Sequence, residues 1–297
     1  LSELLPAKFK KRTTDEGESS RFSLTGFSLT RTGRDHMDMG LDGKVALVTA
    51  ASKGIGRAIA QELAAEGAKV AISGRNEDTL RTAADMIKQG TGKDVATYSM
   101  DLTSESDVKK LIDDVENDLG GIHVLVNSSA GPPTKPFEEL SDEDWKAALD
   151  IKFMAQMRPS REAMPRMKKR DTGRIINIIG SHGRFPHAYA ITAGVVNAAL
   201  LNLTKAMAEE GAPHNVLVNA INPGLTDTER VTYLANIKAE NQGITYDEAV
   251  AEMCEDQVLK RLADPLEIAS MAVLLASPRG GFITGSMIDV DGGMTPC

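Results

Sequence analysis

From residue 42 onward, short runs of β-branched and other apolar residues alternate with longer segments in which apolar residues recur every three or four positions. The short runs predict seven strands, at 44–49, 69–73, 95–99, 123–127, 174–179, 216–221 and 286–290. Continuous apolar runs of this length are typical of strands buried on both faces of a parallel sheet. The segments between them have the period of amphipathic helices and close with glycine. The alternation predicts an α/β fold with a doubly wound, seven-stranded, mainly parallel sheet and helices on both faces.

Two segments depart from this alternation. Residues 1–41 are rich in Ser, Thr and charges of both signs and have no sustained period, so we expect a poorly structured extension or an arm packed on a neighbouring subunit. Residues 229–260 are mostly helical but too long for a tight crossover. They predict either a substrate lid at the carboxyl ends of the strands or a helical pair with only a packing role. Residues 42–297 are expected to form a single domain.

Composition narrows the classes of partner. The chain has 34 Lys+Arg against 42 Asp+Glu, an acidic balance that argues against binding nucleic acid through its phosphates. No run approaches the ~18 consecutive apolar residues that a membrane helix needs. Cys254 and Cys297 are too few for a disulfide framework, and their spacing from the histidines matches no metal site. We therefore expect a cytoplasmic protein that acts on a small molecule, with no metal, nucleic-acid or membrane partner.

A glycine-containing loop follows the first predicted strand directly. Residues 49–57 read TAASKGIGR and open the first predicted helix. Gly54 and Gly56 let the backbone approach a pyrophosphate, whose charge would lie against the helix N-terminus and its free N–H groups. The position of this loop after the first strand, with βαβ units behind it, indicates a dinucleotide site.

This loop is similar to the T-G-x3-G-x-G motif of the short-chain dehydrogenase/reductase family, although Ala50 replaces the first glycine. Members of this family are Rossmann-type oxidoreductases, and the resemblance covers residues 42–293. Later motifs fall in the family's order: Asp101-Leu102 after the third strand, 127–131 at Asn-Asn-Ala-Gly, 223–228 at Pro-Gly-x-x-x-Thr, and Gly285 with 291–293 at the C-terminal signature. The resemblance implies that a nicotinamide dinucleotide is held by Ser52, Lys53, Gly54, Ile55, Gly56, Arg75, Asp101, Leu102, Asn127, Gly224, Thr226 and Thr228.

The residues at the end of the second strand favour NADP(H) over NAD(H). NAD-selective proteins carry an acidic residue there to bind the ribose 2′-hydroxyl. This chain has Gly74 followed by Arg75, and Lys53 lies in the glycine loop. Lys53 and Arg75 could clamp a 2′-phosphate by charge-assisted hydrogen bonds.

The resemblance fails at the catalytic positions. The family uses a Tyr-x3-Lys pair, a Ser thirteen residues before the Tyr, and an Asn on the helix after the fourth strand. Aligned without gaps, this chain has Ala193 at the Tyr position and Asn197 at the Lys position. Gly180 stands at the Ser position, with Ser181 adjacent, and Lys152 replaces the Asn.

One interpretation is that the chemistry has been displaced. Lys152 stands where the family has Asn, and Asn197 stands where it has Lys. An amine could therefore reach the same region of the site, but from the helix after the fourth strand. Tyr189 lies eight residues before Asn197, close to the seven-residue Tyr–Lys spacing of the family's enoyl reductases. The catalytic candidates are Tyr189, Lys152, Ser181 and Asn197, with His182 and His187 as further proton donors.

The leading hypothesis is an NADP(H)-dependent oxidoreductase that transfers hydride to or from a small carbonyl, alcohol or conjugated enone, with a displaced or degenerate active site. Two alternatives stay open: an inactive nucleotide-binding subunit of a heteromer with an active relative, and a non-redox lyase or hydratase on the same scaffold. The resemblance also implies a homotetramer or dimer.

Overall fold

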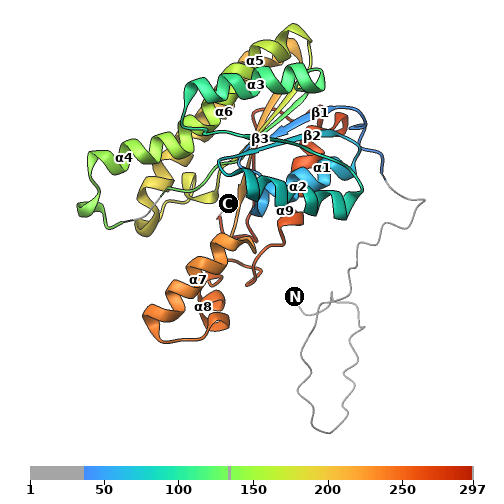
Figure 1. Ribbon diagram of the computed structural model, residues 1–297. Helices are drawn as coiled ribbons and strands as arrows, with labels where there is room; N and C mark the ends of the chain where they lie inside the picture. The colour runs from blue at the N-terminus through green and yellow to red at the C-terminus, as the bar shows by residue number, and fades with distance from the viewer. Residues whose placement is uncertain (1–36, 133–134, 296–297) are drawn as a thin grey trace, which may run out of the picture. The chain divides into compact units, whose positions relative to one another are not determined.

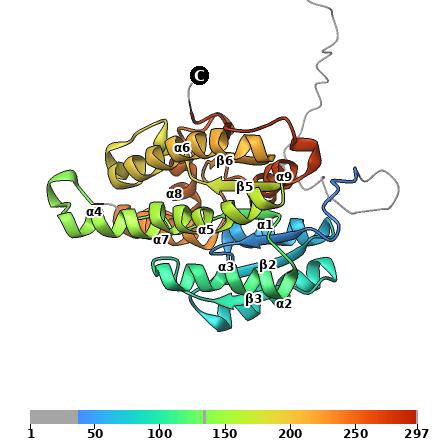
Figure 2. The ribbon, with the colours of Figure 1, turned by 90° about the horizontal axis from the view of Figure 1, so that it is seen from above.

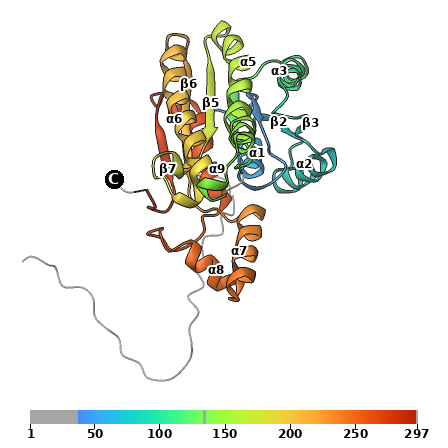
Figure 3. The ribbon, with the colours of Figure 1, turned by 90° about the vertical axis from the view of Figure 1, so that its left-hand side faces the viewer.

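Seven parallel strands form one sheet in the computed structural model, which describes residues 37–132 and 135–295 (Figure 1). The order is β3-β2-β1-β4-β5-β6-β7, and the labels in Figures 2 and 3 follow it across the sheet. All seven predicted strands and the doubly wound fold are confirmed. The strands are β1 (Val45–Val48), β2 (Lys69–Gly74), β3 (Ala96–Ser99), β4 (Val124–Asn127), β5 (Gly173–Ile178), β6 (Val216–Pro223) and β7 (Met287–Val290).

Helices cover both faces of the sheet. One face packs against α1 (Gly54–Ala65), α2 (Glu77–Thr91) and α9 (Pro265–Ala276). The opposite face packs against α3 (Glu105–Leu119), α5 (Ala155–Lys169) and α6 (Ile191–Gly211), which lie together above the sheet in Figure 1. Side chains of a strand alternate between these layers: in β1, Ala46 and Val48 join the first core, whereas Val45 and Leu47 join the second. Burial on both faces explains why the strands read as unbroken apolar runs.

A buried polar network ties the central strands to two helices. Asn127 ends β4 and pairs in register with Asn177 of β5. The Asn127 amide Nδ2 donates to Asn177 Oδ1 at 2.9 Å and to Ser160 Oγ of α5 at 2.7 Å. Asn177 Nδ2 in turn donates to Thr204 Oγ1 of α6 at 2.8 Å. These bonds fix the carboxyl ends of β4 and β5 against α5 and α6.

The helix after β4 contains a π-helical segment. The chain runs from α4 (Asp142–Ala148) through a π-helix (Leu149–Met154) into α5. Widened turns of this kind are rare and often mark functional sites. Lys152 is the buried residue of the segment.

Beyond the carboxyl ends of the strands lie α7 (Glu229–Gln242) and α8 (Tyr246–Met253), below the sheet in Figure 3. The predicted helical character of 229–260 is confirmed for these two helices. Its role as a lid stays a prediction.

The N-terminal segment is described only from residue 37 onward. Of the expected extension at 1–41, residues 1–36 lie outside the described residues. Leu41 is buried in the core, and Arg279 Nε donates to the Asp38 carbonyl at 2.8 Å.

In the described part of the chain, one helical stretch, Ala188–His214, is long and apolar enough to cross a membrane. It includes α6, and half of its most apolar window is buried, as in a core helix.

Candidate dinucleotide and substrate site

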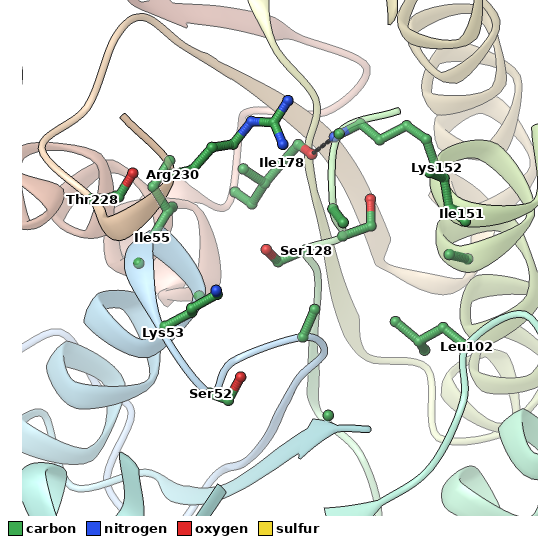
Figure 4. Close-up of a pocket in the computed structure, with 18 of the residues that line it drawn as sticks. Ser52, Lys53, Ile55, Leu102, Ser128, Ile151, Lys152, Ile178, Thr228 and Arg230 are labelled. Carbon is green, nitrogen blue, oxygen red and sulfur yellow. Dashed lines mark hydrogen bonds between the residues drawn. The ribbon is translucent and has the colours of Figure 1, made fainter. Parts of the chain in front are cut away.

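A cavity of about 550 Å³ opens at the carboxyl edge of the sheet, where β1 separates β2 from β4. This reversal of strand order is the usual ligand site of a doubly wound sheet. Figure 4 shows the glycine loop and the start of α7 on one side, and Leu102, Ile151 and Lys152 on the other. Of the predicted cofactor residues, the following line it: Ser52, Lys53, Gly54, Ile55, Gly56, Arg75, Asp101, Leu102, Gly224 and Thr228.

The glycine loop needs its two glycines for different reasons. A Cβ on Gly56 would lie 2.9 Å from the Ala50 carbonyl oxygen, which is too close for any side chain. Gly54 has a φ of +57°, and a Cβ there would meet Thr228 Cγ2 at 3.3 Å. Glycine at both positions therefore lets the N-terminus of α1 approach both the loop and the β6–α7 connection. Among the described residues no side chain caps this helix N-terminus, and Gly54, Ile55 and Gly56 line the cavity, so its first N–H groups are available to bind an anion.

Ala50 occupies the position of the family's first glycine and retains the glycine-like backbone. Its φ is +47°, in the left-handed region that disfavours residues with a Cβ. Alanine at this position therefore holds a backbone conformation that glycine adopts without steric cost.

The part of the cavity next to the ends of β2 and β3 combines one carboxylate, Asp101, with two cations, Lys53 and Arg75. Asp101 Oδ1 accepts from Thr103 N and Oγ1, both at 2.9 Å. The Thr103 N–H, with the hydroxyl and nearby Arg75, holds the pKa of Asp101 below its ordinary value, so it is a carboxylate at neutral pH. Lys53 and Arg75 are exposed at the cavity, and neither forms an ion pair with a carboxylate in the described part of the chain.

Lys152 is the predicted catalytic candidate that reaches the cavity. Its side chain is only 6% exposed, and Nζ donates to the Ile178 carbonyl at 3.2 Å (Figure 4). Gln156 Nε2 donates to the same carbonyl and to Ser129 Oγ, both at 2.9 Å. Burial lowers the pKa of Lys152 to about 8, and nearby Arg230 acts in the same direction.

Arg230 is a cavity residue that the sequence analysis missed. It lies in the first turn of α7, and its guanidinium extends toward Lys152 in Figure 4. A Cβ on Gly131 would be 3.2 Å from Arg230 Nη2, so the glycine leaves room for the guanidinium. A signal was present in the sequence: a cation in the first helical turn opposes the helix dipole and requires another reason to be there.

The other catalytic candidates are not among the cavity-lining residues. Ser181 and Asn197 are buried behind Gly180, whose carbonyl accepts from Asn197 Nδ2 at 3.4 Å. Tyr189 is 62% exposed, and its ring lies 5.6 Å from the His182 ring and 4.9 Å from that of His187. The structure therefore joins Lys152, but not Tyr189, Ser181 or Asn197, to the cofactor residues.

Two predicted cofactor residues also lie outside the lining. Asn127 belongs to the buried polar network described above, and Thr226 is buried, with Oγ1 donating to the Gly224 carbonyl at 3.0 Å. In this structure, both residues support neighbouring segments of the cavity wall.

Comparison with known proteins matches most of the chain to oxidoreductases. The profile of a family described as enoyl-(acyl carrier protein) reductase matches residues 49–295. A 3-oxoacyl-(acyl-carrier-protein) reductase of Aquifex aeolicus is 32% identical over 87% of this chain and 100% of its own length. The NADPH-dependent reductase BacG of Bacillus subtilis is 32% identical over 84% of this chain and 97% of its own.

A solved structure agrees with these matches. L-Sorbose reductase of Gluconobacter frateurii, complexed with NADPH and L-sorbose, superposes with a TM-score of 0.83 at 34% identity. The match covers 87% of this chain and 98% of that one.

Replacing Ala50 by glycine should raise the free energy of unfolding by up to about 1 kcal/mol, because glycine adopts a positive φ without steric cost. The measurement is denaturant unfolding. Ala58→Gly within α1 is the control and should lose about 1 kcal/mol. An equal loss in both variants would contradict the left-handed conformation of Ala50.

Replacing Lys152 by methionine should stabilise the cofactor-free protein at pH 7. The folded pKa near 8 lies below the ordinary value of 10.5, so the folded state binds fewer protons than the unfolded chain between these values. The cost of burying the charge is full below pH 8, at roughly 3 kcal/mol, and disappears as the pH rises to 10.5.

The gain from Lys152→Met should therefore shrink between pH 8 and 10 in denaturant unfolding series. Lys146→Met, at an exposed lysine of α4, is the matched control and should show no such pH dependence. A gain that did not vary with pH would contradict the depressed pKa.

Proposed function

Because the chain belongs to the short-chain dehydrogenase/reductase family of oxidoreductases, we propose that it transfers hydride between NADP(H) and a small carbonyl or conjugated enone. One observation carries the proposal: a single cavity joins the glycine loop to the buried amine of Lys152. The proposal includes a displaced active site, in which Lys152 takes the role that the family assigns to its Asn, Ser, Tyr and Lys residues.

The cavity fits a nicotinamide dinucleotide. The space left by Gly54 and Gly56 and the uncapped N-terminus of α1 suit a pyrophosphate, while Gly224 and Thr228 lie on the β6–α7 side. When bound, the cofactor supplies or accepts the hydride. The protein's part is to hold and orient it and to stabilise charge on the substrate.

The preference for NADP(H) is supported by Lys53 and Arg75, two cations that line the cavity with Gly74 and form no ion pair among the described residues. An NAD-selective protein would need a carboxylate at the end of β2, where this chain has Gly74. BacG, described as an NADPH-dependent reductase, and the sorbose reductase complexed with NADPH agree with this preference.

Lys152 is proposed to stabilise the reacting oxygen. With a pKa near 8, most of its amine is protonated at neutral pH, and Ile178 O orients one of its N–H bonds. The remaining N–H bonds can donate to a substrate carbonyl oxygen, where negative charge develops as hydride arrives, and one proton can then pass to that oxygen. Tyr189 is a second proton donor in the proposal and would have to move inward from its exposed position.

The observation that Ser181, Asn197 and Tyr189 do not line the cavity favours a second candidate function. In that case the chain is a nucleotide-binding subunit without chemistry of its own, assembled with an active relative. Under the first function we propose a cytoplasmic homotetramer or dimer.

NADPH should bind the wild-type protein more tightly than NADH by calorimetric titration. Lys53→Ala and Arg75→Ala should each weaken NADPH binding by about 10-fold or more, because each removes a charge-assisted hydrogen bond to the 2′-phosphate. NADH binding should change by less than about 3-fold.

Arg81→Ala is the control, since Arg81 is an exposed cation of α2 that pairs with Glu77 at 2.9 Å. Equal binding of the two cofactors, or equal losses for both in the variants, would overturn the clamp. Binding of neither cofactor would overturn the proposed function.

Turnover should depend on Lys152. In assays of NADPH absorbance with ketones and enones, Lys152→Met should lower kcat by about 100-fold or more, the usual effect of removing a donor to a developing oxyanion. The wild-type rate should fall as the pH rises above about 8, because the protonated amine is lost.

Lys146→Met should retain wild-type turnover, and Tyr189→Phe measures the contribution of the phenol. If Lys152→Met and Tyr189→Phe both leave turnover unchanged, the displaced chemistry is wrong. NADPH binding without turnover on any substrate would favour the non-catalytic subunit.

A further inference from the structure

We propose that Lys152 and Arg230 together form an anion site inside the cavity, so that the substrate is an oxo acid, a carbonyl compound carrying a carboxylate. The assignment as a substrate rests on the proposed function. The anion site itself rests on the two side chains and can be tested by binding alone.

The two cations approach one part of the cavity from opposite walls. Lys152 comes from the π-helical segment and Arg230 from the first turn of α7, and their charged ends point toward one another in Figure 4. Neither is paired with a carboxylate within residues 37–132 and 135–295. Glu229, the acid next to Arg230, lies 3.5 Å from Arg57 instead.

The charges around the cavity leave this end positive. Its charged lining consists of the cations Lys53, Arg75, Lys152 and Arg230 and the acids Asp101 and Glu229. Asp101 lies with Arg75 in the part next to the ends of β2 and β3, as the effect of Arg75 on its pKa shows. Lys152 and Arg230 therefore face each other without a counter-ion among the described residues that line the cavity.

An anion between them would remove an electrostatic cost. Two like charges repel, and one of these is more than nine-tenths buried, where a charge without a partner is expensive. A carboxylate can accept from both groups, and a guanidinium matches its two oxygens. A neutral molecule of the same shape would leave the repulsion in place, so the site should discriminate by charge.

The geometry of the ammonium group suggests how the carboxylate and the reacting carbonyl share it. Lys152 has three N–H bonds, and the Ile178 carbonyl takes one. Two remain for substrate oxygens, one on the carbonyl and one on the carboxylate. Arg230 would then hold the far side of the carboxylate and orient the carbonyl carbon.

The cofactor's phosphates are a second possible source of negative charge. They have their own donors in the glycine loop, the N-terminus of α1 and Lys53, which lie across the cavity from Lys152 in Figure 4. The experiment must still separate the two sources, because Arg230 and the glycine loop both border the β6–α7 connection.

The test compares acids with their amides on the full-length protein loaded with NADP⁺. Pyruvate, acetoacetate and levulinate vary the spacing between carbonyl and carboxylate, and each is paired with its own amide in calorimetric or saturation-transfer titrations. We expect at least one acid to bind about 10-fold more tightly than its amide, since one charged hydrogen-bonded contact is removed. Arg230→Gln should reduce this ratio to within about 2-fold and leave the Kd for NADPH within about 2-fold.

Arg230→Lys should restore part of the preference for the acid over its amide. Lysine returns the positive charge but not the planar guanidinium that matches two carboxylate oxygens. Arg81→Gln, at the exposed cation of α2, should leave the ratio unchanged. This control separates the local charge of Arg230 from the general loss of one positive charge.

Three outcomes would overturn the proposal. The first is equal affinity for acids and amides in the wild type. The second is an acid preference that survives in Arg230→Gln. The third is a loss of NADPH affinity in Arg230→Gln as large as the loss for the acids, which would assign Arg230 to the cofactor's phosphates. If NADPH fails to bind the wild type, the proposed function fails, and the same acid–amide comparison on cofactor-free protein still decides the anion site.

Discussion

The parallel arrangement of the strands is the constraint on which the site depends. Since every strand runs in the same direction, the carboxyl ends of β1 to β6 meet at one edge, and each connecting loop begins there. The Asn127–Asn177 pair holds two of these ends together and fastens them to α5 and α6. Residues as distant in sequence as Lys53 and Arg230 thereby line one cavity.

The fold could be predicted well because its signals are local. Strands buried on both faces appear as unbroken apolar runs, and the glycine loop carries its spacing in nine consecutive residues. The approach of Lys152 to the cavity was expected from its place in the resemblance, whereas the π-helical turn that carries it was not, since no periodicity in the sequence distinguishes it from an α-helical turn. The exposure of Tyr189 and the approach of Arg230 over Gly131 depend on tertiary contacts, which spacing along the chain does not encode.

The cavity contains a conflict between stability and function. A buried amine that shares a single carbonyl with Gln156 is poorly compensated, and a core-like residue would pack there at lower cost. Buried polar groups that lack enough partners often occur at functional sites. The same reasoning applies to Ala50, whose left-handed backbone keeps the loop in the shape that the glycines require.

The two facing cations differ in how freely evolution can change them. Lys152 is buried and hydrogen-bonded to the end of β5, so another polar or charged side chain there would also need a partner in the interior. Arg230 projects from an exposed helix, where replacement costs little stability. Descendants of this protein can therefore exchange the residue at 230 and test new ligands while keeping the fold intact. Position 230 can therefore vary with the ligand, whereas the buried amine at position 152 stays the fixed part of the site.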